Sequence, residues 1–329
     1  MNADADADGK ARQTRATQLI KPLIPPDAEQ RVERSVKQFS PLLREQLRTE
    51  TGLRLADEKG KTAAPVFVVD GFPDGVARLI DEYDDITLWR LIMLQPKLGA
   101  IIEGLKALLD DWDEFEQWSK LPDVGKGGAP VLQRAGDISL SLQKLAAVET
   151  VLARIRLIKE DILGVYRFGG NRAPRIEIYW MAQALFSAAF GLRIEDLTAV
   201  TLAHELGHAY THRGRDIGGE TWKDQGFAES DAHVVEGLAQ FYAAVASERV
   251  SGRAQGVFEA YKKLLENQAG PYRAHEEWLK DRPEQRGEIV RFAILRARRL
   301  EKVDHAAWID LLSDTGTSLR GSKDKQKSV

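Results

Sequence analysis

Two histidines and a glutamate near residue 205 have the spacing of a metal site. They lie in the pentapeptide His204-Glu205-Leu206-Gly207-His208. On an α-helix, residues four apart are one turn along and about 40° around the axis, so both imidazoles can reach one ion. Glu205 stands beside the first histidine, where its carboxylate can hold and deprotonate a water on the metal. The spacing therefore predicts a catalytic zinc site, with His204 and His208 as ligands and Glu205 as the general base.

The segment around this pentapeptide is predicted to be a helix over residues 197–212. Glu195 and Asp196 precede it, and acidic residues suit a helix N-terminus. Leu202 and Ala209 belong to an apolar flank that suits burial. A buried helix is the context that the metal site needs.

A catalytic zinc site has three protein ligands, so a third must lie elsewhere. His212 follows one turn after His208, but on a continuous helix it lies about 12 Å along the axis from His204, too far to share one ion. It is interpreted as a histidine at the end or rim of the helix. Asp216 and Glu220, in a glycine-rich loop, remain candidates by residue type alone.

The next predicted helix, over residues 228–248, contains the string Glu236-Gly237-Leu238-Ala239-Gln240-Phe241. Together with the pentapeptide, this string resembles the gluzincins, metallopeptidases with HExxH on one helix and a glutamate ligand on the next. The resemblance covers residues 175–244. It implies that His204, His208 and Glu236 bind one zinc ion per chain, in a zincin-like catalytic domain that acts on a peptide or protein substrate.

Other positions refine the resemblance. Gly237 and Ala239 are small and would let the two helices pack closely. A metzincin would have glycine and histidine where this chain has Thr211 and Gly214, so that group is excluded. Some gluzincins carry an acidic residue where this chain has Gln240.

The run HELGHAYTH, followed by a charged loop and a Glu-x-x-Ala helix, also resembles the ImmA/IrrE regulatory peptidases of bacteria. This second resemblance implies the same four site residues.

A polar stripe follows one face of the predicted third-ligand helix. Glu229, His233, Glu236 and Gln240 are spaced at i, i+4, i+7 and i+11, so they share that face. The stripe either supports the metal ligands or is a solvated helix surface, and for Glu229 both interpretations are open. His233 is the alternative third ligand, and Asp231, off this face, is interpreted as a helix cap.

Residues after this helix are candidates for stabilising the transition state, which needs a hydrogen-bond donor aimed at the developing oxyanion. They are Tyr261, Tyr272, Arg273 and His275. For each of them, ordinary core or surface packing is the alternative interpretation.

Residues 164–168 and 175–180 are predicted to be two strands joined by the turn Gly169-Gly170-Asn171. By the resemblance, the second strand would be the sheet edge that hydrogen-bonds an extended substrate. Its residues are Ile176, Glu177, Ile178, Tyr179 and Trp180, of which Trp180 is the aromatic candidate for contact with substrate.

The helices and strands expected along the chain must position the site, and together they predict a helix-dominated α+β protein with a small sheet. A strand is expected over residues 65–69, and Pro41 is expected to kink or split a helix over 28–47. Further helices are expected over 86–94, 97–118, 138–162, 182–190, 254–268, 273–281, 284–299 and 305–312.

The chain is expected to comprise disordered residues 1–25, a mainly helical region over 26–160, the zincin-like domain over 161–315 and a polar, frayed tail over 316–329. It has 329 residues, no cysteine, and 47 basic against 50 acidic residues. The absence of cysteine excludes disulfides and thiolate ligands, and the balanced charge disfavours nucleic-acid binding. Without an apolar signal or spanning segment, the expectation is a cytoplasmic protein that binds no membrane.

Two functions fit these patterns. The first is a zinc peptidase that hydrolyses a peptide bond. The second is a non-catalytic or regulatory metal-binding interaction protein on a metallopeptidase scaffold. Glu205 favours the first, because a purely structural metal site has no use for a carboxylate beside its ligand.

Overall fold

The computed structural model describes residues 13–56, 63–97, 147–155, 158, 162–169, 173–268, 270–280 and 283–327. Most of the expected helix over 97–118 lies outside these residues. Of the helix expected over 138–162, residues 147–155 are helical, whereas residues 158 and 162, which are also described, are not. The described chain is helix-dominated α+β with a small mixed sheet, as predicted. None of its helices is long and apolar enough to cross a membrane.

Within the described residues the sheet has three strands, β1 (Val66–Val69), β2 (Gly164–Arg167) and β3 (Arg175–Tyr179), in the order β1-β3-β2. Strand β1 runs parallel to β3, and β2 pairs with β3 in the antiparallel hairpin that the sequence predicted. The prediction that residues 176–180 form the sheet edge is wrong, because β3 is the central strand. Its hydrogen-bonding groups are used on both sides, so it cannot add a further strand.

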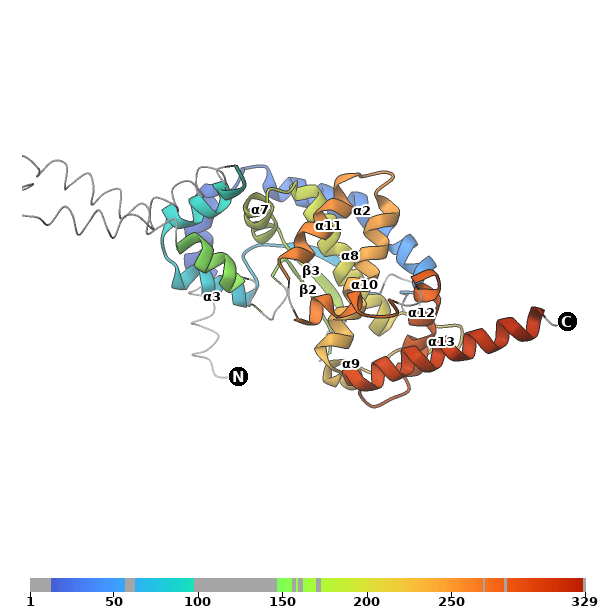
Figure 1. Ribbon diagram of the computed structural model, residues 1–329. Helices are drawn as coiled ribbons and strands as arrows, with labels where there is room; N and C mark the ends of the chain where they lie inside the picture. The colour runs from blue at the N-terminus through green and yellow to red at the C-terminus, as the bar shows by residue number, and fades with distance from the viewer. Residues whose placement is uncertain are drawn as a thin grey trace, which may run out of the picture.

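Helix α8 (Ile194–Arg213) is the centre of the molecule, and its residues are buried along nearly its whole length. It packs against the sheet and most extensively against α10 (Ala232–Val250) and α2 (Ala28–Thr51) (Figure 1). Such all-round burial suits a helix with small and apolar residues on every face. The two helices that carry the predicted ligands, α8 and α10, are therefore in direct contact.

Two glycines, Gly207 and Gly237, lie at close contacts of α10. A Cβ on Gly207 would lie 3.0 Å from the Ala239 backbone, so α8 and α10 touch at this pair. The small residue that allows this approach is Gly207, and Ala239 meets it with its backbone. Gly237 does not serve it, because a Cβ there would meet the Trp278 ring at 2.7 Å instead.

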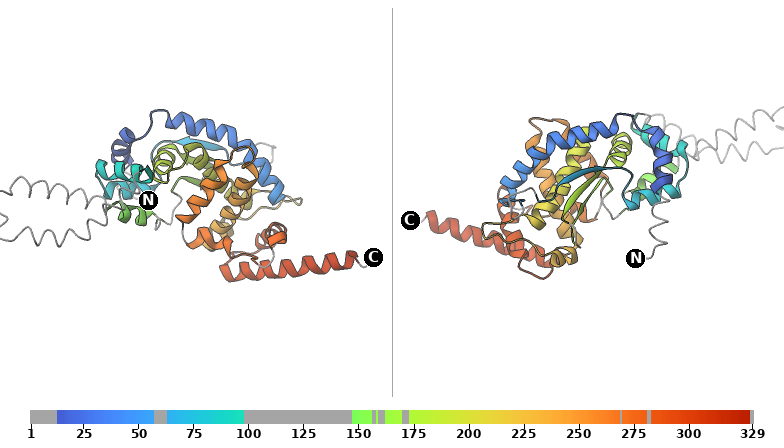
Figure 2. Two further views of the ribbon diagram at one scale, coloured as in Figure 1. Left: turned by 45° about the horizontal axis from the view of Figure 1, so that its top comes forward. Right: turned by 180° about the vertical axis from the view of Figure 1, so that it is seen from behind.

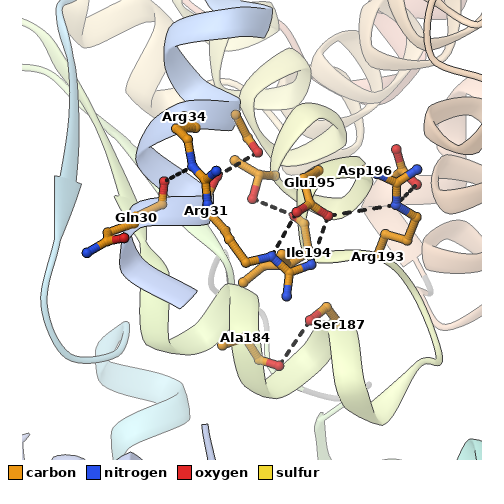
Figure 3. A network of polar contacts seen from close by, with 11 residues as sticks. Gln30, Arg31, Arg34, Ala184, Ser187, Arg193, Ile194, Glu195 and Asp196 are labelled. Atoms are coloured by element: carbon orange, nitrogen blue, oxygen red, sulfur yellow. Dashed lines mark hydrogen bonds and ion pairs between the residues drawn. The ribbon is translucent and has the colours of Figure 1, made fainter. Parts of the chain in front are cut away.

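Helix α2 covers one side of the molecule (Figure 2). It continues through Pro41 to a C-cap at Gly52 with φ 68°, so the predicted split does not occur. Arg31 of α2 forms a two-pronged ion pair with Glu195, at 2.8 and 3.0 Å, which ties α2 to the first turn of α8 (Figure 3). Arg193 lies 3.8 Å from the same carboxylate.

Residues 13–25 are folded, in contrast to the disorder expected of them. Residues 13–20 are helical, and Ala16 and Ile20 are fully buried. Gln13 donates to the Phe72 carbonyl and accepts from its N–H. The apolar spacing of Ala16, Ile20 and Ile24 is one residue per turn, too sparse a signal among polar neighbours to predict a buried helix.

The third-ligand region is two helices and not one. Residues 228–248 were predicted as a single helix, but α9 (Asp224–Glu229) ends at Glu229 and α10 begins at Ala232. Asp231 caps α10 by accepting the His233 N–H at 2.8 Å, as predicted for this residue.

The C-terminal part also differs from expectation. Of the helix expected over 273–281, residues 273–276 belong to the 3₁₀ helix η2 (Gly270–Glu276) and residues 277–280 form a turn. Helix α13 continues well beyond residue 312 into the segment expected to fray, and it projects from the body of the molecule (Figure 1). Residues 86–97 are also helical. The other labelled elements are η1 (Lys21–Leu23), α3 (Asp74–Glu82), α7 (Trp180–Ala189), α9 (Asp224–Glu229), α11 (Gly256–Glu266), η2 (Gly270–Glu276), η3 (Pro283–Gln285), α12 (Arg286–Ala297) and α13 (His305–Lys327).

Candidate metal centre

Three donor atoms converge between α8 and α10. The Nε2 atoms of His204 and His208 lie 3.1 Å apart, and each lies 3.3 Å from Oε2 of Glu236. Among the described residues, these three are the group of histidine and acidic side chains that could hold a metal ion. The structure therefore brings together the two helical histidines and the glutamate predicted from the next helix.

The spacing of these atoms fits a tetrahedral ion. Ligands bound to zinc at about 2.0–2.1 Å in tetrahedral directions are about 3.3 Å from one another. The carboxylate oxygen Oε2 of Glu236 is buried and makes no hydrogen bond among the described residues, although both imidazoles are close. Three donor atoms at this spacing, with no hydrogen bond to the carboxylate oxygen, are chemically suited to share one cation.

The charge of Glu236 is stabilised in place. Burial alone would raise the pKa of its carboxyl group. The charge interaction with His208 and the polar contacts with both histidines outweigh burial, so the pKa of Glu236 lies well below its usual range. The carboxylate is therefore ionised at neutral pH, as a ligand must be.

Glu205 is buried on α8, with 1% of its surface exposed. Strand β2 passes directly over it, since a Cβ on Gly164 would lie 3.1 Å from Oε1 of Glu205. The absence of a side chain at residue 164 therefore leaves space for this carboxylate between helix and strand.

The transition-state candidates fall into two groups. The Tyr272 ring lies 5.9 Å from the His204 ring and is half-buried. Tyr261 and His275 instead bond each other at 2.9 Å, and Nδ1 of His275 lies 3.1 Å from the Tyr272 carbonyl oxygen. Arg273 is exposed and paired with Glu276. Of these four residues, Tyr272 is the one with a ring contact to a candidate ligand.

His275 is held neutral. Burial, with repulsion from Arg286, lowers the pKa of His275 to about 4. Its Nδ1–H can then donate to the Tyr272 carbonyl while Nε2 accepts from the Tyr261 hydroxyl. The pair Tyr261–His275 thus supports η2, the turn that bears Tyr272.

The polar stripe predicted on the third-ligand helix is not continuous. Glu229 belongs to α9, is exposed and accepts from Gln225. The His233 side chain is 43% exposed and bonds Asp231. Gln240 is buried and donates to Gln268 at 2.8 Å. Glu236 is the member of the stripe that meets the two histidines.

The strand residues predicted to bind substrate have other partners. Ile176 and Ile178 are fully buried. Glu177 forms ion pairs with Arg167 and Arg175 at 2.5 and 2.7 Å. Tyr179 donates to Glu177, and Trp180 is the first residue of α7 and donates to Asp70.

His212 lies in the last turn of α8, as expected for a histidine at the helix end, but it is fully buried and not at a rim. Its Nδ1 lies 3.1 Å from the Tyr166 hydroxyl. Its ring stacks on Phe227 at 4.4 Å and meets Phe168 edge-on at 4.6 Å. Burial, with repulsion from Arg213, Arg298 and His208, lowers the pKa of His212 to about 3, so the ring is neutral.

Sequence reasoning did not identify the side chains around His212. Tyr166 and Phe168 come from β2, and Phe227 from α9. Nothing in the local pattern connects these segments to α8. The one available signal was the position of His212, a turn after His208 on the same side of the helix.

Comparisons with protein-family models, with curated proteins and with solved structures find no match to this chain. The geometry of the site and the resemblance of its short motifs are therefore the basis for its function.

Proposed function

We propose that this protein is a zinc-dependent hydrolase, and specifically a peptidase with one zinc ion per chain. The observation that supports this most directly is the convergence of His204, His208 and Glu236 at 3.1–3.3 Å. Two nitrogens and one carboxylate oxygen are a typical ligand set for catalytic zinc, which keeps its fourth position for water.

In this proposal the chain's residues divide the chemistry. A bound zinc ion would lower the pKa of water and polarise the substrate carbonyl. Glu205 takes the proton from the attacking water and delivers it to the departing amine. Tyr272 donates its hydroxyl hydrogen to the carbonyl oxygen as negative charge develops there.

The strand that would bind an extended substrate is β2, which is an edge strand of the sheet formed by the described residues. The Tyr179 N–H donates to the Leu163 carbonyl, so these two residues are a hydrogen-bonded pair. In an antiparallel ladder such pairs alternate, so the backbone groups of Gly164 and Tyr166 point away from β3. A peptide that pairs with them would lie beside Glu205.

A second function is favoured by one observation, the burial of the site. His204 and His208 are only 7% and 4% exposed, which suits a non-catalytic metal site in a regulatory interaction protein. Both functions predict bound metal, and only the peptidase needs a proton acceptor at residue 205.

Replacing Glu205 with glutamine separates the two functions. The amide keeps the shape of the side chain but cannot take the proton, so we expect Glu205→Gln to retain zinc and fold while hydrolysis falls by about 10² to 10⁴. Zinc is measured by elemental analysis and hydrolysis with a mixture of casein-derived peptides, with and without a chelator.

The matched control is Glu229→Gln, which makes the same change at an exposed residue outside the site. It should keep both zinc and activity. Wild-type protein that holds zinc but cleaves no peptide would favour the regulatory function, and protein without stoichiometric zinc would contradict both.

A further inference from the structure

The ring of His208 is enclosed by two aromatic side chains from other elements. Tyr166 of β2 lies parallel to it, with ring centroids 6.4 Å apart and planes at 9°. Phe227 of α9 meets it edge-on, at 6.4 Å and 85°. The orientation in which the His208 ring presents its Nε2 to the metal site is therefore restricted by an aromatic ring on each of two sides.

His212 connects these two aromatic side chains. Its ring stacks flat on Phe227, at 4.4 Å and 7°, and its Nδ1 lies 3.1 Å from the Tyr166 hydroxyl. Because His212 follows His208 by one turn on α8, the ligand and the residue that holds its neighbours are on the same rigid element.

Asp224 restricts His212 in turn. One of its carboxylate oxygens, Oδ1, lies 3.2 Å from Nε2 of His212, without hydrogen-bond geometry, and 2.6 Å from the Arg213 guanidinium. A carboxylate at this side of the ring favours the tautomer with the proton on Nε2. Nδ1 of His212 then accepts the Tyr166 hydroxyl hydrogen.

Among the described residues, no carboxylate or carbonyl orients His208 through its second ring nitrogen. Ligand histidines normally donate their second ring N–H to a carboxylate, carbonyl or water. Nδ1 of His208 is buried and has no hydrogen-bond partner within the described part of the chain. Gln240, which stands where some gluzincins have an acid, bonds Gln268. Packing must therefore orient this ring.

We infer that Tyr166 is a positioning residue for the metal site, fixed by His212 and Asp224 so that its ring holds the imidazole of His208 in the plane needed for coordination. This inference rests on the proposed metal site. Since Tyr166 also belongs to β2, the strand proposed to pair with substrate contributes to the metal centre through the same side chain.

The test measures metal affinity and geometry without relying on activity. Tyr166→Phe removes the hydroxyl and frees the ring from His212, and His212→Leu removes the acceptor. We expect both variants of the full chain to bind zinc about 10- to 100-fold more weakly in chelator competition, the usual effect of losing such a support. Their cobalt-substituted forms should show altered visible absorption, which reports ligand geometry.

Two further variants serve as controls. Tyr210→Phe removes another buried hydroxyl of a tyrosine, one that donates to the Arg44 carbonyl at 2.7 Å. It should lower thermal stability as much as Tyr166→Phe does, with unchanged zinc affinity. His212→Asn places an amide oxygen near the former Nδ1 and should restore affinity and spectrum relative to His212→Leu.

The outcomes are distinct. Folded Tyr166→Phe with wild-type zinc affinity and an unchanged cobalt spectrum would overturn the positioning role and leave the proposed function intact. Equal losses in Tyr166→Phe and Tyr210→Phe would show general destabilisation and also overturn it. Wild-type protein that binds neither zinc nor cobalt would overturn the proposed function itself.

Discussion

At the level of single residues, the third ligand decides what kind of site this is. His204 and His208 offer two nitrogens, which also occur in sites with quite different third ligands. Glu236 adds a carboxylate oxygen 3.3 Å from both. His233 lies on the same helix, but its side chain is 43% exposed and bonds Asp231.

Replacing Glu236 and His233 with alanine, one at a time, tests this assignment. Glu236→Ala should abolish stoichiometric zinc binding, because it removes one of three ligands and leaves an incomplete site. His233→Ala should retain zinc, since the imidazole is engaged with Asp231 outside the site. Elemental analysis of both variants is the measurement. The reverse pattern, with zinc lost only in His233→Ala, would transfer the ligand role to His233.

At the level of elements, the contact between α8 and α10 sets the distance between the ligands. Gly207 stands between His204 and His208 in sequence, and its missing side chain is replaced in space by Ala239. The backbones can approach this closely because residue 207 has no side chain.

We expect Gly207→Val to weaken zinc binding and to destabilise the fold. The added side chain would press on the Ala239 backbone, and overpacking of this kind costs typically about 1–3 kcal/mol. Gly287→Val is the control, because a Cβ there meets open space. Denaturant unfolding and zinc titration measure the two effects. Wild-type zinc affinity in folded Gly207→Val would show that the site tolerates a wider helix separation.

The C-terminal end of α8 is held by a buried cation. Arg298 donates to the carbonyl oxygens of Tyr210 and Thr211 and, at 3.4 Å, to that of Glu220. Burial lowers the pKa of Arg298 to about 10, so it remains charged at neutral pH. A cation at this position complements the negative end of the helix dipole.

Removing this cation should destabilise the protein without removing the metal ligands. In Arg298→Met the buried carbonyls lose their donor, and unsatisfied buried groups cost about 1–3 kcal/mol. The adjacent Arg299→Met, whose side chain is 73% exposed, should change stability little. Urea unfolding of the metal-free proteins compares them. Equal stability of the two variants would mean that water replaces the guanidinium.

At the level of the whole molecule, two buried neutral histidines tie stability to pH. The pKa values of His212 and His275 are lowered to about 3 and about 4, below the ordinary value near 6.5. The unfolded chain therefore binds more protons than the folded chain between these limits. Stability from both groups is fully present above about pH 6.5 and is lost as the pH falls through that range.

The slope of this loss is measurable. Below the unfolded-state pKa, each such histidine contributes about 1.4 kcal/mol per pH unit to the fall in unfolding free energy. Denaturant unfolding of the metal-free protein between pH 7 and pH 4.5 should show the decline. His275→Gln should reduce the slope of unfolding free energy against pH by the contribution of one histidine. An unchanged slope in that variant would show that His275 is protonated in the folded state.

Much of the site could be predicted because it lies within one helix. The relation of His204, Glu205 and His208 follows from the helix period, which is the same in any fold. The alternation and turn around residue 169 likewise predicted the β2–β3 hairpin. These features depend on neighbours in sequence, so a local pattern is sufficient to predict them.

Only the tertiary structure decided the rest. The motif likeness suggested Glu236, but its position 3.3 Å from both histidines depends on the approach of α10 to α8. That β2 and not β3 ends the sheet depends on the parallel pairing of β1. His212 is buried because β2 and α9 cover it. Each outcome depends on packing between segments that are distant in sequence. Residue spacing is compatible with several such arrangements, and the free energy of burying apolar surface determines which one is the most stable.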